Sequence, residues 1–248
     1  MHRFYLAPEP WDAGALALTG AEAHHGRNVL RLERGDKVVV FDGRGRELTG
    51  EIIATGSSEI QLRKLHEART PPLRCQITLA QAIPKGKNMD LIVQKAVEIG
   101  AAEIAPIISD RTVVRLDEES AVAKQTKWQT VAIEAAKQCG QNWLPAVHAP
   151  QTMAQFFNER RRFDLQLIGS LQSDAVHLKK ILADYECEHG DRPRSVLMLV
   201  GPEGDFTPAE LSLARSHGCR PITLGPIALR VETASIYCLS VLSYELLV

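Results

Sequence analysis

The chain has 248 residues, enough to bury a sizeable core in one large domain or two modest ones. Hydrophobic residues make up 45% and charged residues 24%, as in most globular proteins, and no apolar run predicts a membrane span. The net charge of −1 excludes an indiscriminate polyanion binder, although Lys and Arg slightly outnumber Asp and Glu in residues 1–162. Five dispersed cysteines without a C-x-x-C pair, and an N-terminus without a signal-peptide core, predict a cytoplasmic protein.

Short strand signals dominate the chain before Pro71 and Pro72, which prevent regular continuation. The stretch 36–65, DKVVVFDGRGRELTGEIIATGSSEIQLRKL, predicts about three strands separated by turn signals at Asp42-Gly43 and at 56–58. Residues 1–71 are therefore predicted to form a small β-barrel.

Beyond Pro72, strand and helix signals alternate. Two helix starts are well marked, with Asn88 as a predicted N-cap and Thr207 with Glu210 as a predicted capping box. The predicted strands are 75–83, 102–109, 164–170, 195–200 and 219–225, and the predicted helices are 88–99, about 118–138, 175–185, 207–217 and 233–247. This alternation predicts an α/β fold with a mostly parallel sheet over residues 72–248.

Three predicted strands end in stretches rich in Gly and Pro, at 167–170, 199–206 and 224–230. In open α/β sheets, ligands bind beyond the carboxyl ends of strands, and glycines let the backbone approach a ligand closely. The three stretches together predict a pocket walled by backbone and suited to a nucleoside-like ligand. The alternative is that each is a plain turn between a strand and a helix.

Other familiar sites are excluded by spacing. The chain has no G-x-S-x-G nucleophile elbow, no G-x-x-x-x-G-K-[ST] phosphate loop and no G-x-G-x-x-G fingerprint. Cys187, His189, His217 and Cys219 resemble a zinc set, but their one-residue gaps do not match the spacing of structural zinc sites. No metal is therefore expected.

Basic residues gather in HHGRNVLRLERGDK, residues 24–37. If this stretch is helical, Arg27, Arg31 and Arg34 fall on one face and form a stripe for phosphates. A solvated helix face is the alternative. Further basic residues that could extend the stripe are Arg3, Lys85, Lys87, Arg111 and Arg115.

GPEGDF at 201–206 and LGPIALRVETA at 224–234 resemble motifs of the RsmE family, SPOUT-class methyltransferases that act on N3 of a uridine in 16S ribosomal RNA. The blocks at 24–36, 83–112 and 127–140 are similar to the same family, so that the resemblance covers the whole chain. It implies a PUA-like, RNA-binding barrel at 1–71 and a SPOUT domain at 72–248, whose trefoil knot binds S-adenosyl-L-methionine (SAM). It further implies a homodimer that acts on the small ribosomal subunit, away from membranes.

The resemblance also implies roles for particular residues. Arg230 would donate N–H groups to a uracil oxygen, and Glu232 would orient Arg230 or accept the proton from N3. For Glu232, a favourable charge at a helix start is an equal alternative, and for Arg230 a structural salt bridge is one. The implied RNA-binding residues are Arg3, Arg27, Arg31, Lys85 and Arg111. The implied cofactor-binding residues are Ile168, Gly169, Leu199, Val200, Gly201, Pro202, Glu203, Gly204, Leu224, Gly225, Pro226, Ala228 and Leu229.

Two positions depart from the family pattern: Asp205 stands where Gly is usual, and Gln141 stands where Arg is usual. We expect the first to leave cofactor binding intact, because the loop acts through its backbone, and the second to weaken one RNA or folding contact. Two other functions remain open. One is a SPOUT methyltransferase that acts on tRNA, and the other is a non-catalytic ribosome-assembly factor of the same fold.

Overall fold

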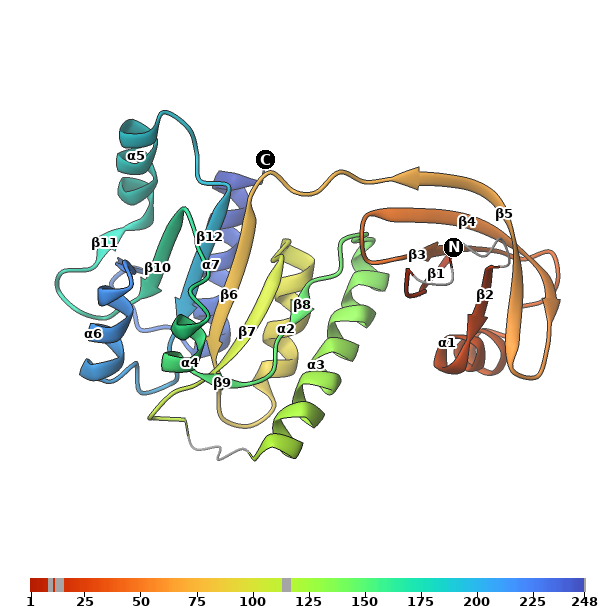
Figure 1. The fold of residues 1–248 in the computed structure, drawn as a ribbon, viewed down its shortest axis with the longest axis horizontal. Helices are drawn as coiled ribbons and strands as arrows, with labels where there is room; N and C mark the ends of the chain where they lie inside the picture. The colour runs from red at the N-terminus through yellow and green to blue at the C-terminus, as the bar shows by residue number, and fades with distance from the viewer. Residues whose placement is uncertain (9–10, 12–15, 113–116, 248) are drawn as a thin grey trace. The chain divides into compact units, whose positions relative to one another are not determined.

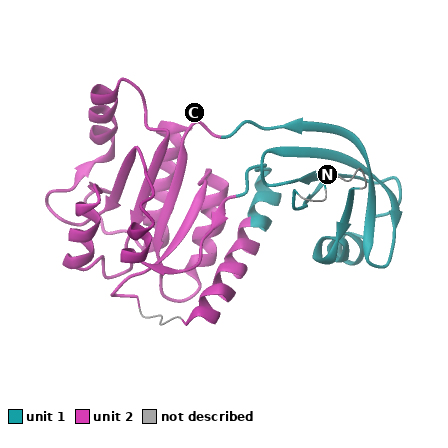
Figure 2. Ribbon diagram, in the orientation of Figure 1, with its two compact units in different colours: residues 1–72, 133–144 teal, residues 73–132, 145–248 magenta. Residues whose placement is uncertain are grey.

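The computed structural model describes residues 1–8, 11, 16–112 and 117–247, which form two compact units (Figure 2). Unit 1 comprises residues 1–72 and 133–144, and unit 2 comprises residues 73–132 and 145–248. The sequence placed the domain boundary between residues 71 and 72 and assigned 133–144 to the second domain. In the structure, a boundary between the units also falls within helix α3 (Glu118–Cys139).

Unit 1 contains a curled five-stranded sheet in the order β1-β3-β4-β5-β2. Its core consists of side chains from the inward-facing positions of the strands, such as Phe4, Val40 and Ile60. The three predicted strands and both turns between them are confirmed, whereas β1 and β2 were not predicted. The strands are β1 (His2–Tyr5), β2 (Leu16–Thr19), β3 (Lys37–Phe41), β4 (Arg46–Thr55) and β5 (Glu59–Arg69).

The predicted helical stripe of arginines in unit 1 is wrong. The helix α1 (Gly20–His24) continues only through a π-helical turn η2 (His25–Val29). Arg31 then has a φ of 54°, in the left-handed region, which ends the helical spacing before Arg31 and Arg34. These arginines therefore do not share a helix face with Arg27.

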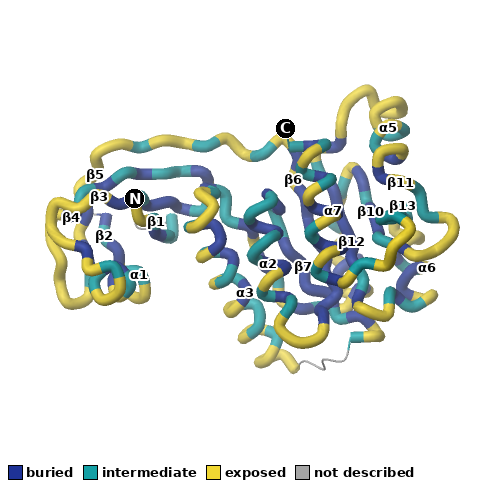
Figure 3. Tube along the Cα trace, turned by 180° about the vertical axis from the view of Figure 1, so that it is seen from behind, coloured by how far each residue is buried: buried dark blue, intermediate teal, exposed yellow. Residues whose placement is uncertain are grey.

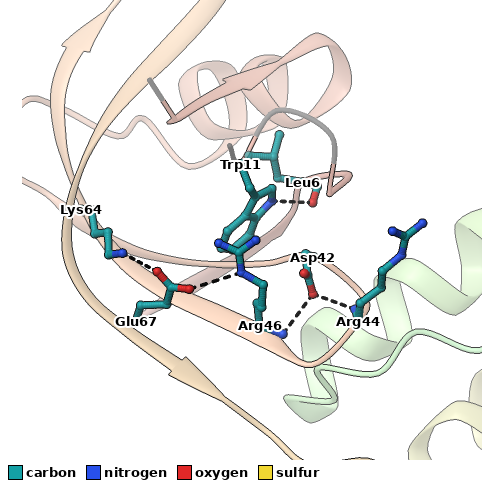
Figure 4. A network of polar contacts seen from close by, with 7 residues as sticks. All are labelled: Leu6, Trp11, Asp42, Arg44, Arg46, Lys64 and Glu67. Atoms are coloured by element: carbon teal, nitrogen blue, oxygen red, sulfur yellow. Dashed lines mark hydrogen bonds and ion pairs between the residues drawn. The ribbon is translucent and has the colours of Figure 1, made fainter. Parts of the chain in front are cut away.

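Figure 4 shows how the turn between β3 and β4 uses its polar groups. The buried carboxylate of Asp42 accepts hydrogen bonds from the backbone N–H of Arg44 (2.6 Å) and of Arg46 (3.0 Å). The Arg46 guanidinium pairs with Glu67 (3.2 Å) and lies 4.9 Å from the centre of the Trp11 ring. Arg46 is thus part of the fold of the barrel, whereas the exposed Arg44 side chain points away from the network (Figure 4).

Unit 2 is built on an eight-stranded sheet in which every strand pair is parallel, confirming the predicted fold class. The strand order is β11-β13-β10-β12-β6-β7-β8, and β9 pairs with β7. The strands are β6 (Gln76–Ala82), β7 (Glu103–Ile108), β8 (Ala146–Val147), β9 (Gln151–Thr152), β10 (Leu165–Gly169), β11 (Val176–His177), β12 (Ser195–Val200) and β13 (Arg220–Thr223).

Helices cover both faces of this sheet, whose strands are largely buried (Figures 1 and 3). On one face α7 lies against β6 and β12 and packs with α2. On the other face α4 and α6 contribute Phe156 and Leu211 to a core cluster with Leu197 and Leu199 of β12. The helices are α2 (Asn88–Ile99), α4 (Met153–Asn158), α5 (Leu178–His189), α6 (Pro208–Ser216) and α7 (Val231–Leu246). Among the described residues, no helix is both long and apolar enough to cross a membrane.

The two predicted helix starts have different outcomes. The capping box of α6 is confirmed, because the Thr207 hydroxyl accepts from the Glu210 N–H (3.3 Å) and Glu210 accepts from the Thr207 N–H (2.8 Å). The prediction of Asn88 as the N-cap of α2 is wrong, because Lys87 occupies that position and Asn88 is the first helical residue. The Asn88 side chain is therefore available for another partner.

Glu210 also joins α6 to the segment after β7. The residue is 7% exposed, and its carboxylate accepts from the Asp110 N–H (3.0 Å) and the Ser109 hydroxyl (3.2 Å). A buried carboxylate stabilises the fold only while it and each N–H or O–H group that donates to it keep their hydrogen bonds.

We predict that Glu210→Gln destabilises unit 2 by about 2 kcal/mol, because an amide N–H₂ would face backbone donors that then lose their acceptor. The measurement is the melting temperature. Glu188→Gln is the control, because Glu188 lies exposed on α5 and should tolerate the same change. Equal melting temperatures for the two variants would contradict the role given to Glu210.

Candidate cofactor and catalytic site

A cavity of about 140 Å³, here called the strand-exit cavity, lies at the carboxyl ends of β10, β12 and β13. Because these strands are parallel neighbours or next neighbours, the three Gly- and Pro-rich stretches that follow them meet at one edge of the sheet. The lining residues are Gly169, Ser170, Leu171, Val200, Gly201, Pro202, Glu203, Asp205, Leu224, Gly225, Ile227, Ala228, Leu229, Val231 and Ala234.

Most of the residues suggested for cofactor binding line this cavity, and four do not: Ile168, Leu199, Gly204 and Pro226. Ile168 and Leu199 are fully buried in the core cluster between the sheet and the helices α4 and α6. Alternation along a strand explains this, because the residue after each, Gly169 or Val200, lines the cavity instead. The lining residues not suggested by the sequence are Ser170, Leu171, Asp205, Ile227, Val231 and Ala234.

Asp205 stands where the family usually has Gly, at a position whose backbone is left-handed. Its φ of 61° lies in the left-handed region, which glycine adopts without strain and Asp tolerates better than most residues. The Asp205 carboxylate accepts from the N–H of Phe206 (2.8 Å) and so supports the turn locally. The loop thus keeps the backbone shape that glycine would allow.

The Gly-rich loop at 201–206 is fastened to two neighbouring segments of unit 2. Glu203 accepts from the backbone N–H of Lys85 (2.9 Å), and the Arg111 guanidinium donates to the carbonyl of Gly204. Two of the suggested RNA-binding residues therefore lie beside this loop. Lys85 uses its backbone there, and its exposed ammonium has no ion pair among the described residues.

Arg230 and Glu232 stand at the start of α7. Arg230 is the N-cap residue, yet its side chain does not cap the helix, and it is exposed without an ion pair in the described part of the chain. Glu232 lies in the first turn, where its carboxylate accepts from the Asn88 side-chain amide at 3.1 Å. Leu229 and Val231 both line the strand-exit cavity, so Arg230 lies at its rim. The start of α7 therefore presents an exposed cationic donor and, two residues later, a carboxylate that is held by Asn88.

The other suggested RNA-binding residues belong to unit 1 and are engaged to different degrees. Arg3 pairs with Glu47 (2.7 Å) and donates to the Asn142 side chain (2.6 Å), so its guanidinium is engaged within unit 1, on the opposite face of β1 from the buried Phe4. The half-buried Arg27 donates through its guanidinium to the backbone carbonyls at residues 56 and 57. Arg31 is exposed, and Arg115 lies outside the described residues.

Three of the five cysteines are buried, and two are exposed. Among the described residues, no group of three or more His, Cys, Asp or Glu is placed to hold a metal ion. Burial raises the pKa of the Cys75, Cys219 and Cys238 thiols to about 12, so these thiols are not nucleophiles near neutral pH. Two other cavities are larger than the strand-exit cavity, but neither is lined by Gly-rich strand exits.

Comparisons with known proteins match both units. Residues 71–243 match a family model described as an RNA methyltransferase domain, and residues 18–65 match an RNA methyltransferase PUA domain. A ribosomal RNA small subunit methyltransferase E from Synechocystis is 32% identical over 236 residues, covering 94% of this chain and 74% of that protein.

Two solved structures are similar over nearly the whole chain. A putative methyltransferase from Legionella pneumophila, in complex with SAM, is 32% identical with a TM-score of 0.86, covering 98% of this chain and 97% of that one. A ribosomal RNA small subunit methyltransferase E from Neisseria gonorrhoeae, bound to S-adenosyl methionine, is 31% identical with a TM-score of 0.85, covering 99% and 98%. With two family models, full-length relatives and the strand-exit cavity in agreement, the chain belongs to the family of ribosomal RNA small subunit methyltransferase E enzymes.

Proposed function

We propose that the protein transfers a methyl group from SAM to N3 of a uridine in 16S ribosomal RNA of the small subunit. The observation that carries this proposal is the strand-exit cavity with Arg230 at its rim. The cavity would hold a nucleoside-like cofactor, and Arg230 would stabilise a substrate that becomes anionic as it reacts.

The residues of the cavity fit SAM. Glycines at 169, 201 and 225 leave backbone groups accessible, and Val200, Leu224 and Leu229 supply apolar surface for an adenine ring. A volume of 140 Å³ is below the roughly 300 Å³ at which drug-sized sites begin, so the cavity would enclose only part of the cofactor. When bound, SAM supplies an electrophilic methyl group.

The protein's own contribution is to make the uridine nitrogen nucleophilic. N3 carries an imide proton on the Watson–Crick edge, so the base must be unpaired and that proton must leave. Arg230 stabilises the uracil anion by donating to a ring oxygen, and Glu232 accepts the proton or orients Arg230. The Asn88 amide holds the Glu232 carboxylate in position for either task.

Further properties of the family belong to the same proposal. The loops after β10, β12 and β13 form the trefoil knot, and the protein is a cytoplasmic homodimer. Exposed apolar side chains next to the cavity and along α7 support a subunit interface, because such patches are rarely left to solvent. They are Leu171 and Ile227, each 74% exposed, and Tyr237 and Tyr244. Arg27, Arg31, Lys85 and Arg111 contact RNA, and Arg3 supports the barrel that presents it.

The direct test is methyl transfer from labelled SAM to small ribosomal subunits that lack the modification, followed by mapping of the labelled nucleotide. Label at N3 of a 16S uridine supports the proposal. Label in tRNA alone would assign the protein to another SPOUT reaction. SAM binding without methyl transfer to any RNA would indicate a non-catalytic assembly factor.

Arg230→Ala should reduce methyl transfer by on the order of a hundredfold, the usual effect of removing one donor to a developing anion. SAM affinity and melting temperature should stay close to those of the parent, because the exposed side chain makes no ion pair among the described residues. Arg230→Lys should recover only part of the activity, because an ammonium lacks the planar fork. Full activity in Arg230→Ala would show that Arg230 has no role in methyl transfer.

Glu232→Gln and Asn88→Ala should separate the two roles of the carboxylate. If Glu232 accepts the proton, Glu232→Gln lowers turnover, and higher pH restores part of it because the solvent then removes the proton. Asn88→Ala should lower turnover less, since the carboxylate stays but loses its fixed position. Rate profiles against pH provide the measurement. A lowered melting temperature with normal turnover in both variants would instead indicate a helix-start role.

Asp205→Gly should retain SAM affinity and the melting temperature, because glycine adopts a φ of 61° freely and the loop keeps its backbone shape. Asp205→Ala should lower stability by about 1–2 kcal/mol relative to Asp205→Gly, because a Cβ remains while the supporting carboxylate is lost. SAM titration and thermal melting of both variants provide the measurements. Equal behaviour of the two variants would show that the left-handed backbone is not what this position requires.

A further inference from the structure

A second cavity in unit 2, here called the amino-edge cavity, lies toward the opposite end of the parallel sheet. Its volume is about 380 Å³, within the range of roughly 300–1,000 Å³ typical of small-molecule sites. Gln166 near the start of β10 lines this cavity, whereas Gly169 at the end of β10 lines the strand-exit cavity. His217, which precedes β13, lines it as well. The two cavities are therefore separate sites.

One wall of the amino-edge cavity is a fixed aromatic stack. The imidazole of His217 lies on the ring of Phe157, with 4.4 Å between ring centres and 17° between planes. Phe157 is buried in the core, whereas His217 is exposed. His217 Nδ1 is 3.0 Å from the Leu213 carbonyl, and Nε2 has no hydrogen bond to the described residues. An immobilised ring of this kind is a platform on which a nucleobase can stack.

A side-chain amide stands beside this platform in a fixed orientation. Gln166 Nε2 donates to the His217 carbonyl at 2.9 Å, which sets the direction of the amide plane. Its Oε1 and second N–H form no hydrogen bond with the described residues, and Asn158 adds another amide to the same cavity. An acceptor next to a donor is the pattern that pairs with N6 and N7 of adenine.

The cavity also has a cation without an ion pair among the described residues. Arg160 is exposed, lines the cavity and has a φ of 52°, in the left-handed region where Gly is usual. Keeping a side chain there costs roughly 1–2 kcal/mol. Arg161, in contrast, pairs with Glu103 and lies over Phe156 and Phe163, so its charge is already balanced.

A purely structural explanation covers part of this arrangement. Arg160 and His217 follow α4 and α6, and positive side chains are favourable at helix carboxyl ends. That role requires neither the stacked imidazole nor the oriented amide of Gln166. Their convergence with Arg160 on one cavity points to a ligand.

We propose that the amino-edge cavity binds an adenosine 5′-phosphate unit. The base stacks at His217 and pairs with the Gln166 amide, and the phosphate lies on the Arg160 guanidinium. The unit is either free AMP or an unpaired adenosine within an RNA strand, because both present the same groups. This site goes beyond the proposed methyl transfer and does not depend on it.

The test is isothermal titration of the full chain with AMP, UMP, short single-stranded oligoadenylate and oligouridylate. Saturating SAM is present throughout to block adenosine binding at the strand-exit cavity. Arg160→Gly relieves the strained backbone, so it should keep or raise the melting temperature while weakening binding about tenfold or more. Arg162→Ala is the matched control, because Arg162 is exposed and adjacent but does not line the cavity.

Adenylate binding that exceeds uridylate binding and is lost in Arg160→Gly but kept in Arg162→Ala supports the proposal. A clear advantage of oligoadenylate over AMP then identifies RNA as the source, and equal affinities identify the free nucleotide. Absence of binding, or equal losses in the two variants, overturns it. If SAM itself fails to bind, the proposed methyl transfer fails, yet the comparison of Arg160→Gly with Arg162→Ala still decides this site.

Discussion

The buried carboxylate of Glu210 is the interaction on which the strand-exit cavity depends. It joins the start of α6 to the segment after β7, while Glu203 and Gly204 are held by Lys85 and Arg111. The cavity is formed by loops that follow strands, so the fit to a ligand depends on how these loops are held in place. Contacts made by Glu210, Glu203 and Arg111 with neighbouring segments thus hold the loops around the cavity.

A contact with a neighbouring element also positions a site residue at the start of α7. Glu232 receives its hydrogen bond from Asn88, at the start of another helix on the same face of the sheet, whereas Arg230 is exposed. In the proposed reaction the carboxylate would be held by Asn88, and the exposed guanidinium would be open to the substrate. An arginine donates more strongly to an anionic oxygen than to a neutral carbonyl, so under the proposed reaction Arg230 would favour the uracil anion over the neutral base.

The architecture of unit 2 could be predicted because its signals are local. Alternating strand and helix patterns, a capping box and three Gly-rich exits each occupy a short stretch, and the structure places the exits at one edge of the sheet. Which residues face the cavity was harder to predict. Ile168 and Leu199 lie within the motifs yet point into the core, because strand alternation and not motif membership sets the direction of a side chain.

Contacts between residues far apart in the chain could not be predicted from the sequence. Arg3 is committed to Glu47 and Asn142, and neither partner is recognisable from its neighbours along the chain. Arg31 breaks the expected helical spacing through its backbone, which a helix pattern does not reveal. In the sequence, His217 belongs only to a set of residues whose spacing does not match zinc sites, and the fold places it on one cavity with Gln166 and Arg160.

The link between β6 and α7 has a consequence for how the chain reaches its folded state. The Ser235 hydroxyl donates to the Gln81 side chain, and the two residues, both fully buried, are 154 positions apart. During synthesis Gln81 leaves the ribosome long before its partner exists, so one face of β6 remains uncovered. Such distant pairing folds slowly and exposes apolar surface meanwhile. The parallel sheet therefore completes its packing late in synthesis, and until α7 arrives the nascent chain is at its most vulnerable to aggregation.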